Sequence, residues 1–113
     1  MSDKMLTITL TNRAPVQIAT AEWPIIAHGD GHDGKIESEA NRKWWLRVRR
    51  HGNRLIAYGA YESNWENENN RRRGEELTTD EDIPAAIHRV AESLGLEADF
   101  AEEVIATLPA ERL

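Results

Sequence analysis

Alternating hydrophobic and polar residues are most regular between residues 42 and 61, on either side of a short glycine-containing turn. Alternation with a period of two around such a turn predicts a β-hairpin. A two-residue loop would pair Val48 with Ala57 and would put Ile56 and Tyr58 on one face with arginines. A three-residue loop pairs Val48 with Ile56 and leaves one face wholly apolar. Because a slip of one residue exchanges the two faces of a strand, we expect the three-residue loop.

The outer face of this hairpin is expected to be basic. It carries Trp45 among basic side chains, which are Arg42, Lys43, Arg47, Arg49, Arg50, His51 and Arg54. One interpretation is a contact surface for phosphate or for an acidic protein, since guanidinium groups donate in pairs and stack on aromatic rings. The other is a solvated sheet face, whose arginine stems cover Trp45 and whose charges pair with the acidic part of the chain.

The segment before the hairpin contains two shorter strand patterns. Residues 5–10 alternate cleanly and predict a half-buried strand, and residues 16–18 predict a second short piece. Thr20 is expected to cap a brief helical turn. The apolar side chains expected to point inward after it are Trp23, Ile25 and Ile26.

Residues 28–34, with the sequence HGDGHDG, predict a mobile surface loop, since ordering three glycines is costly in conformational entropy. Its two histidines and two aspartates are side chains that bind divalent ions, but their spacing matches no defined metal-binding loop. We therefore expect no metal here. Residues 35–39 predict a strand that leads into the hairpin.

The polar segment after the hairpin, residues 63–70, predicts an exposed connection. It contains Trp65, which either contacts a protein partner or folds back to cover the sheet. The basic cluster that follows predicts the start of a strand returning beside the hairpin, and consists of Arg71, Arg72 and Arg73. Its charges either add to the basic face or pair locally with Glu75 and Glu76.

The C-terminal third predicts two helices. Asp82 is expected to cap the first, with Pro84 in its first turn and Gly95 at its end. Its apolar stripe consists of Ile83, Ala86, Ile87, Val90 and Leu94. The second helix is expected at 97–107, and its buried residues would be Phe100, Val104 and Leu108.

These elements predict an α+β fold in one domain, residues 1–113, with an antiparallel β-sheet built around the hairpin and packed against two C-terminal helices. The net charge of −6 is unevenly distributed. Residues 1–74 carry 12 Lys and Arg against 9 Asp and Glu, a net +3, whereas residues 75–113 carry 2 against 11, a net −9. The acidic end would repel a polyanion, so nucleic acid would have to bind through one face only.

Other features narrow the class of protein. The chain has no cysteine and no apolar run near the roughly 18 residues that span a bilayer. We therefore expect a soluble, cytoplasmic protein without membrane contact. No nucleophile motif or phosphate-binding loop is present: Gly29, Gly31 and Gly34 have the G-x-G-x-x-G spacing but lead into a strand pattern instead of a helix. We expect no catalytic residues, no cofactor and no enzymatic activity.

Several short strings occur together that are similar to a known group. They are residues 10–16 (LTNRAPV), 22–24 (EWP), 45–49 (WLRVR), 58–59 (YG), 82–87 (DIPAAI) and 108–111 (LPAE). The chain thus resembles small uncharacterised proteins carried on proteobacterial plasmids, integrative elements and prophages. The resemblance spans most of the chain and implies a genomic setting, without catalytic residues to transfer. Small acidic proteins of such elements often act by binding, and include inhibitors of host defence such as anti-CRISPR proteins.

The sequence therefore predicts a non-enzymatic binding module of a mobile genetic element that engages a protein or ribonucleoprotein partner. The alternative is a direct nucleic-acid-binding protein, with Arg47, Arg49 and Arg50 on phosphates and Trp45 stacked on a base. A homodimer formed through the sheet edge or through Trp65 is a third possibility.

Overall fold

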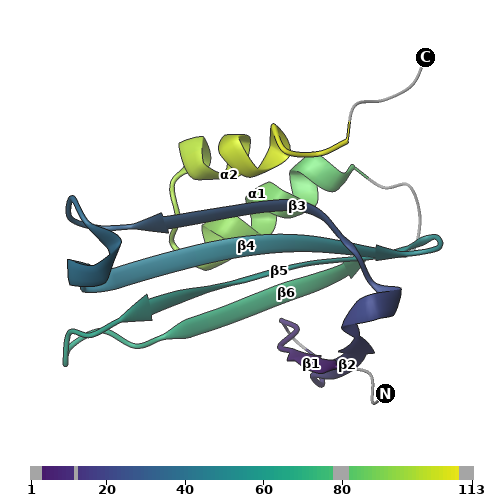
Figure 1. Ribbon diagram of the computed structural model, residues 1–113, viewed down its shortest axis with the longest axis horizontal. Helices are drawn as coiled ribbons and strands as arrows, with labels where there is room; N and C mark the ends of the chain where they lie inside the picture. Colours follow the sequence, from purple (N-terminus) through teal and green to yellow (C-terminus); the bar gives the residue numbers. More distant parts are fainter. Residues whose placement is uncertain (1–3, 12, 78–81, 110–113) are drawn as a thin grey trace.

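The computed structural model describes residues 4–11, 13–77 and 82–109. Its main sheet is antiparallel and is built around the predicted hairpin (Figure 1). In spatial order, the strands are β3 (Ile25–His32), β4 (Arg42–His51), β5 (Arg54–Ser63) and β6 (Arg71–Leu77). The predicted return of the chain from residue 71 beside the hairpin is thus confirmed as β6.

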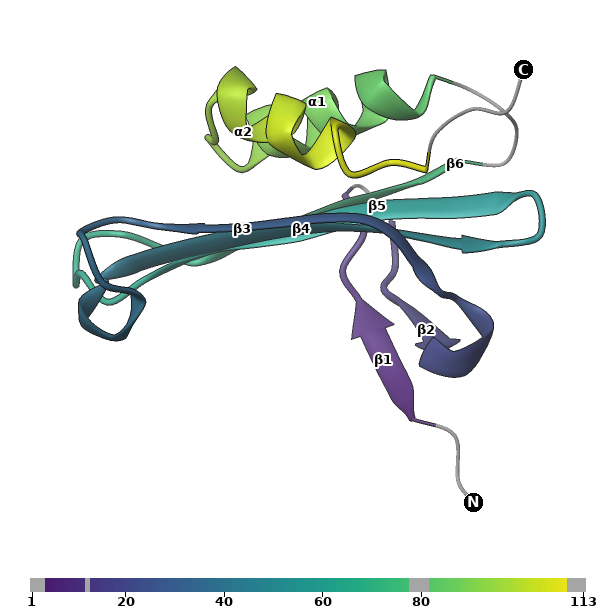
Figure 2. The same ribbon diagram turned by 45° about the horizontal axis from the view of Figure 1, so that its top comes forward.

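A two-stranded ribbon and two helices cover the main sheet from opposite sides, as Figure 2 shows. The ribbon consists of β1 (Met5–Ile8) and β2 (Val16–Ala19), which correspond to the predicted strands. The helices are α1 (Ile83–Ser93) and α2 (Ala98–Ile105). The structure is therefore α+β, with the sheet between two unequal layers.

The hairpin has the register that the sequence analysis rejected. Val48 lies opposite Ala57 and His51 opposite Arg54, so the loop contains only Gly52 and Asn53. Gly52 has a φ of 60°, as a two-residue hairpin loop requires. The prediction of a three-residue loop was wrong because it assumed that only one face of the hairpin is buried.

The sheet in fact separates two hydrophobic cores, and alternate residues of β5 contribute to each. Leu55 and Ala57 pack in the core under the helices, whereas Ile56 and Tyr58 pack in a smaller core under the ribbon. Ile56 and Tyr58 therefore have an apolar environment on the face where arginines also lie. The smaller core is completed from the N-terminal segment by Ile8, Leu10, Ile18 and Trp23.

β3 occupies most of the segment that was predicted to be a mobile loop. Its glycines permit close packing instead of flexibility. A Cβ atom at Gly31 would overlap the indole ring of Trp44, and a Cβ atom at Gly29 would lie 2.7 Å from Cγ2 of Val104 on α2. The prediction failed because the three glycines were attributed to a loop, although two of them lie under large side chains.

The connection from β3 to β4 also differs from the prediction. Residues 35–39 do not form a strand; a single 3-10 turn, η2 (Glu37–Glu39), reverses the chain instead. Asp33 stabilises this reversal, since its Oδ1 accepts hydrogen bonds from the backbone N–H groups of Asn41 and Arg42. Ile36 is the only large apolar residue of the segment and is 54% exposed, so no face is available to bury a strand.

The turn before β3 is a 3-10 helix, η1 (Thr20–Glu22), where a helical turn was predicted. Trp23 is buried as expected, but Ile25 is 43% exposed, so its predicted inward orientation was wrong. Ile25 precedes a register shift in β3, between Ile25 and Ala27, that changes the alternation of faces.

Both C-terminal helices follow their sequence signals. The Asp82 carboxylate accepts a hydrogen bond from the Ala85 N–H at 3.3 Å, and Gly95 ends α1 with a φ of 77°. Phe100 and Val104 of α2 are buried against the sheet. Leu108, predicted to be buried, is only partly so, and α2 is shorter than the predicted 97–107.

Both edge strands of the main sheet have a backbone hydrogen bond to a threonine from outside the sheet. On β3, the His28 N–H donates to Oγ1 of Thr107 at 3.0 Å. On β6, the Gly74 N–H donates to Oγ1 of Thr11 at 3.3 Å, and its carbonyl accepts from the Thr11 N–H at 2.8 Å. These contacts occupy groups that would otherwise be free to pair with another chain.

Candidate functional site

The residues predicted to form one basic surface lie in three places. The face that carries the ribbon holds Trp45, Arg47, Arg49, Arg54 and Arg72. Arg50 lies on the helix-covered face near the hairpin tip, where it borders a hollow with Ile26 and Ile83. Arg71 and Arg73 share that face at the opposite end of the sheet, where residues 64–70, which include Trp65, connect β5 to β6. The sheet thus divides the predicted surface.

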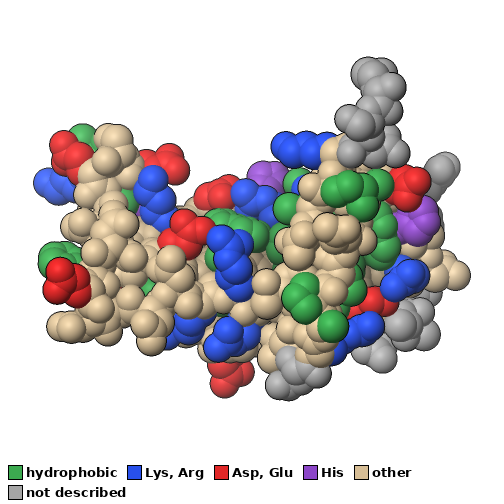
Figure 3. Space-filling model, turned by 90° about the horizontal axis from the view of Figure 1, so that it is seen from below, with side chains coloured by type: hydrophobic (Ala, Val, Ile, Leu, Met, Phe, Trp, Pro, Cys, Tyr) green, Lys and Arg blue, Asp and Glu red, His purple; other side chains and the backbone are tan. Residues whose placement is uncertain are grey.

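The ribbon covers only the half of its face nearest to the hairpin tip. We call the other half the open sheet face; its side chains are His28, Asp30, His32, Lys43, Trp45, Arg47, Glu62 and Arg72. Figure 3 shows this side of the molecule hollowed between the ribbon and the far end of the sheet. Basic, acidic and hydrophobic side chains meet in this hollow, so it is not a uniformly basic surface.

Trp45 lies on the open sheet face next to the core under the ribbon, and its neighbours hold it in place. The Arg47 guanidinium carbon lies 5.3 Å from the centroid of the Trp45 ring, and Tyr58 contacts the same ring edge-on at 5.6 Å. Arg47 is itself fixed, since it donates to Asp30 Oδ1 at 2.9 Å and to the Leu46 carbonyl at 2.8 Å. The indole is therefore partly buried and preoriented.

Arg49 and Arg54 hold the ribbon and its connection on the sheet. Arg49 donates to the Tyr58 hydroxyl and to the Trp23 carbonyl, both at 2.8 Å. Arg54 donates to Glu76 at 2.7 Å and lies 5.7 Å from the Trp23 ring centroid. Their guanidinium groups are thus used within the molecule. Arg50 likewise donates to the carbonyl of Gly52 at 2.9 Å.

A separate charged network occupies the end of the sheet, and sequence reasoning did not identify it. Arg42 donates two hydrogen bonds to Glu68, at 2.9 and 3.1 Å, and one to Asp33 at 3.3 Å. Hydrogen bonds from Arg42 and then from Ser63 lower the pKa of Glu68, and the same ion pair raises the pKa of Arg42. Trp65 is 50% exposed, and the Arg42 guanidinium carbon lies 5.6 Å from the centroid of its ring. Trp65 therefore belongs to this end and not to the face of Trp45.

The two aspartates of residues 28–34 have separate contacts in the structure. Asp30 pairs with Arg47, whereas Asp33 accepts hydrogen bonds from Asn41 and Arg42. The backbone N–H of Arg42 is the first cause of a lowered pKa at Asp33. In the described part of the chain, no three His, Asp or Glu side chains converge as metal ligands.

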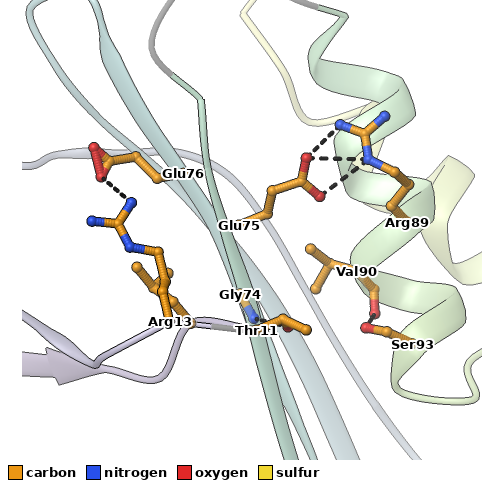
Figure 4. A pocket seen from close by; sticks show the side chains of 9 residues that line it. Thr11, Arg13, Gly74, Glu75, Glu76, Arg89, Val90 and Ser93 are labelled. Atoms are coloured by element: carbon orange, nitrogen blue, oxygen red, sulfur yellow. Dashed lines mark hydrogen bonds and ion pairs between the residues drawn. The ribbon is translucent and has the colours of Figure 1, made fainter.

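A pocket of about 360 Å³ lies between the N-terminal segment, β6 and α1 (Figure 4). Its charged groups are already paired, since Arg13 lies 3.7 Å from Glu76 and Arg89 donates two hydrogen bonds to Glu75 at 3.1 Å. Ser93 lines the same pocket, but its hydroxyl donates to the Val90 carbonyl at 2.7 Å. No histidine or lysine among the described residues lines the pocket beside Ser93.

Comparison of the chain with protein-family models, with curated proteins and with solved structures found no match. Within the described residues, neither helix has the length and apolar character needed to cross a bilayer. The function must therefore be argued from the geometry of the surfaces.

Sequence reasoning missed two partners of the open sheet face, Asp30 and Tyr58. Asp30 was attributed to a mobile loop, and Tyr58 was placed in the core on the other side of the sheet. The alternation of His28, Asp30 and His32 with small residues was the available signal for a strand, with those three side chains on one face.

Proposed function

We propose that the protein is a non-enzymatic binding module of a mobile genetic element, and that it engages a host protein or ribonucleoprotein through the open sheet face. The observation that carries the proposal is Trp45, which contacts Arg47 and Tyr58 on the open sheet face. Tryptophan, tyrosine and arginine are the residues that most often contribute binding energy at protein interfaces. A preoriented side chain also loses little conformational entropy on binding.

The charges of this face favour a protein partner over nucleic acid. Arg47 is paired with Asp30 at 2.9 Å, and Arg72 is paired with Glu62 at 3.6 Å. A nucleic-acid surface needs cations that are available to phosphates, because release of counterions supplies much of the affinity. An alternating pattern of charges instead provides both signs for the polar rim of a protein interface.

The genomic setting rests on the resemblance of the chain to small proteins of proteobacterial mobile elements. Inhibition of a host defence complex, of the anti-CRISPR type, is a role that this setting suggests. Such a partner would be a protein or a ribonucleoprotein, which accords with a contact surface of mixed charge. The proposal assigns no catalytic residue and no cofactor.

The variant Trp45→Ala tests this proposal. Retention of a partner from a lysate of the native host is compared among wild type, Trp45→Ala and the control Trp65→Ala, with each fold checked by thermal unfolding. Loss of a central anchor weakens binding by about 2 kcal/mol or more, about 30-fold. Trp45→Ala should therefore lose the partner, and Trp65→Ala should retain it.

The exposed substitution Arg72→Glu provides a second variant, should Trp45→Ala be unstable, and should also weaken capture. A folded Trp45→Ala or Arg72→Glu protein that retains the same partner as strongly as wild type would contradict the proposal. A salt titration with random DNA and RNA distinguishes the proposed protein or ribonucleoprotein partner from the alternative, direct binding of nucleic acid. A steep decrease of affinity with salt would identify direct nucleic-acid binding.

A further inference from the structure

A second surface lies at the other end of the sheet and on its helix-side face. A hollow of about 470 Å³ is lined there by Tyr61, by residues 67–70 and by Arg71 and Arg73. Arg71 and Arg73 are two positions apart on β6, so their side chains leave the strand on the same side. Two guanidinium groups therefore border one concave space.

These two arginines differ from most of the other sheet arginines. Arg42, Arg47, Arg54 and Arg72 each lie within 3.6 Å of a carboxylate oxygen. Neither Arg71 nor Arg73 forms an ion pair with a residue that the structure describes. Among the described residues, the Arg73 guanidinium donates only to the carbonyl of Arg72, at 2.8 Å. Their positive charges are thus available to a ligand.

The acidic residue of this hollow does not cancel those charges. Glu68 accepts two hydrogen bonds from Arg42 and one from the Ser63 hydroxyl at 2.6 Å. The carboxylate of Glu68 is therefore paired with Arg42, and within the described part of the chain it forms no ion pair with Arg71 or Arg73. Asn70 adds a neutral donor, since its oxygen accepts from the Ser63 N–H and its NH₂ group remains for a ligand.

The guanidinium of Arg71 is held in place. Its carbon lies 4.6 Å from the centroid of the Tyr61 ring, and its buried Nε atom has no hydrogen-bond partner among the described residues. Burial of an unpaired donor costs free energy, which a structure tolerates where the group has a role. Stacking on Tyr61 fixes the plane of the guanidinium and so preorganises it for an anion.

An apolar hollow of about 380 Å³ adjoins this site and shares Tyr61 with it. Its other apolar walls are Trp44, Leu96 and Phe100, and the exposed Glu97 also lines it. Trp44 stacks on Tyr61 with the two rings 6° from parallel. Gly95 lines the apolar hollow and also approaches Arg71, since a Cβ atom there would lie 3.2 Å from Nη2 of the arginine. Arg71 therefore lies between the hollow lined by the two arginines and the hollow lined by aromatic rings.

We propose that these adjoining hollows bind a small ligand in which a phosphate or carboxylate group is attached to an aromatic or apolar group. The anionic group lies between Arg71 and Arg73, and the apolar group lies against Trp44 and Phe100. This site lies on the opposite face of the sheet from the open sheet face, so it does not depend on the function proposed above.

Nuclear magnetic resonance of the ¹⁵N-labelled full chain at low ionic strength tests the site. Four probes are titrated: inorganic phosphate, adenosine 5′-monophosphate, acetate and N-acetylphenylalanine. We expect saturable shifts, for the two ring-containing probes or for one of them, at the amides of 67–73 and at the Trp44 indole. Saturation by the nucleotide alone identifies phosphate as the anion, and saturation by the amino-acid derivative alone identifies carboxylate.

Two variants with the same change in net charge locate the binding. Arg71→Gln with Arg73→Gln should weaken binding of the saturating probe about tenfold or more, since the double variant removes both charged donors to the anion. The control Lys43→Gln with Arg72→Gln changes the opposite face and should change affinity by less than about twofold. The proposal is overturned if neither ring-containing probe saturates, if the shifts lie elsewhere, or if both variants weaken binding equally.

Discussion

Arg49 donates a hydrogen bond from Nε to the hydroxyl of Tyr58, 2.8 Å away across the hairpin. The same guanidinium donates to the carbonyl of Trp23, which follows the N-terminal ribbon. An arginine that the sequence marks as a surface cation thus connects the sheet to the ribbon. This contact explains why Tyr58 shares a face with arginines, an arrangement that the analysis of hydrophobic pattern had rejected.

Removal of the Tyr58 hydroxyl should therefore destabilise the fold. In Tyr58→Phe, Arg49 Nε loses its acceptor, while the aromatic ring still contacts Trp45. We expect a loss of about 1–2 kcal/mol in the free energy of unfolding, measured with urea. Tyr61→Phe is the control, because within the described part of the chain the Tyr61 hydroxyl makes only a long hydrogen bond, of 3.5 Å, to Glu68. Equal losses for the two variants would show that the Arg49 contact has no special role.

Gly31→Ala tests the packing of β3 against the Trp44 indole. The added methyl group would overlap that ring, so the side chain or the strand must move. Overpacking of this kind costs about 1–3 kcal/mol. Gly34→Asn serves as a control, since a Cβ atom at Gly34 would have no neighbour within 4 Å and Asn tolerates the φ of 73° at this position. An unchanged stability of Gly31→Ala would show that this glycine is not required by packing.

The elements that local chemistry determines could be predicted from the sequence. Asp82, Pro84 and Gly95 delimit α1 because caps act within a few residues. The hairpin register depends instead on a distant segment, since the ribbon makes the environment of Ile56 and Tyr58 apolar. Period-two alternation records which residues share a face, but it does not record what covers that face.

For the candidate site, too, the residue types could be predicted from the sequence, whereas the contacts between them could not. The sequence identified Trp45 and the arginines as candidate contacts, because their types are characteristic of interfaces. It could not show that Arg47 pairs with Asp30, or that Arg71 and Arg73 lie on the opposite face from Arg72. Those relations depend on the register of four strands, and a shift of one residue would exchange them.

Acid should weaken the network at the end of the sheet. The pKa of Glu68 is lowered mainly by hydrogen bonds from Arg42, and the pKa of Asp33 mainly by the Arg42 backbone N–H. A carboxyl with a lower pKa in the folded state contributes stability above its unfolded pKa, about 4, and loses it as the pH falls through the folded value. We therefore expect the unfolding free energy to fall below about pH 4, and to fall less steeply in Glu68→Gln.

Urea unfolding at a series of pH values measures how the unfolding free energy depends on pH. Glu92→Gln is the matched control, because Glu92 is exposed and forms no ion pair with the described residues. Its pH profile should follow that of wild type. A Glu68→Gln profile parallel to wild type would contradict the role assigned to the Arg42–Glu68 pair.

The threonine contacts at the two sheet edges predict the state of association. Thr11 and Thr107 occupy backbone groups of Gly74 and His28, so we expect wild type to sediment as a monomer over a range of concentrations. The double variant Thr11→Val with Thr107→Val removes the hydroxyl acceptors, which frees the N–H groups of Gly74 and His28, and should associate as the concentration rises. A wild-type dimer that the double variant leaves unchanged would show that the edges do not control association.

Site-specific photo-crosslinking shows whether a protein partner binds at position 45 of the open sheet face. A photoreactive phenylalanine derivative replaces Trp45 on the open sheet face or, as a control, exposed Glu103 on α2, in cells that naturally carry the protein. We expect a crosslink to one protein from position 45, and we expect this crosslink to be lost when Arg72→Glu is added. Position 103 should give no such product. Crosslinks only to nucleic acid from position 45, or the same protein product from both positions, would contradict the proposed function.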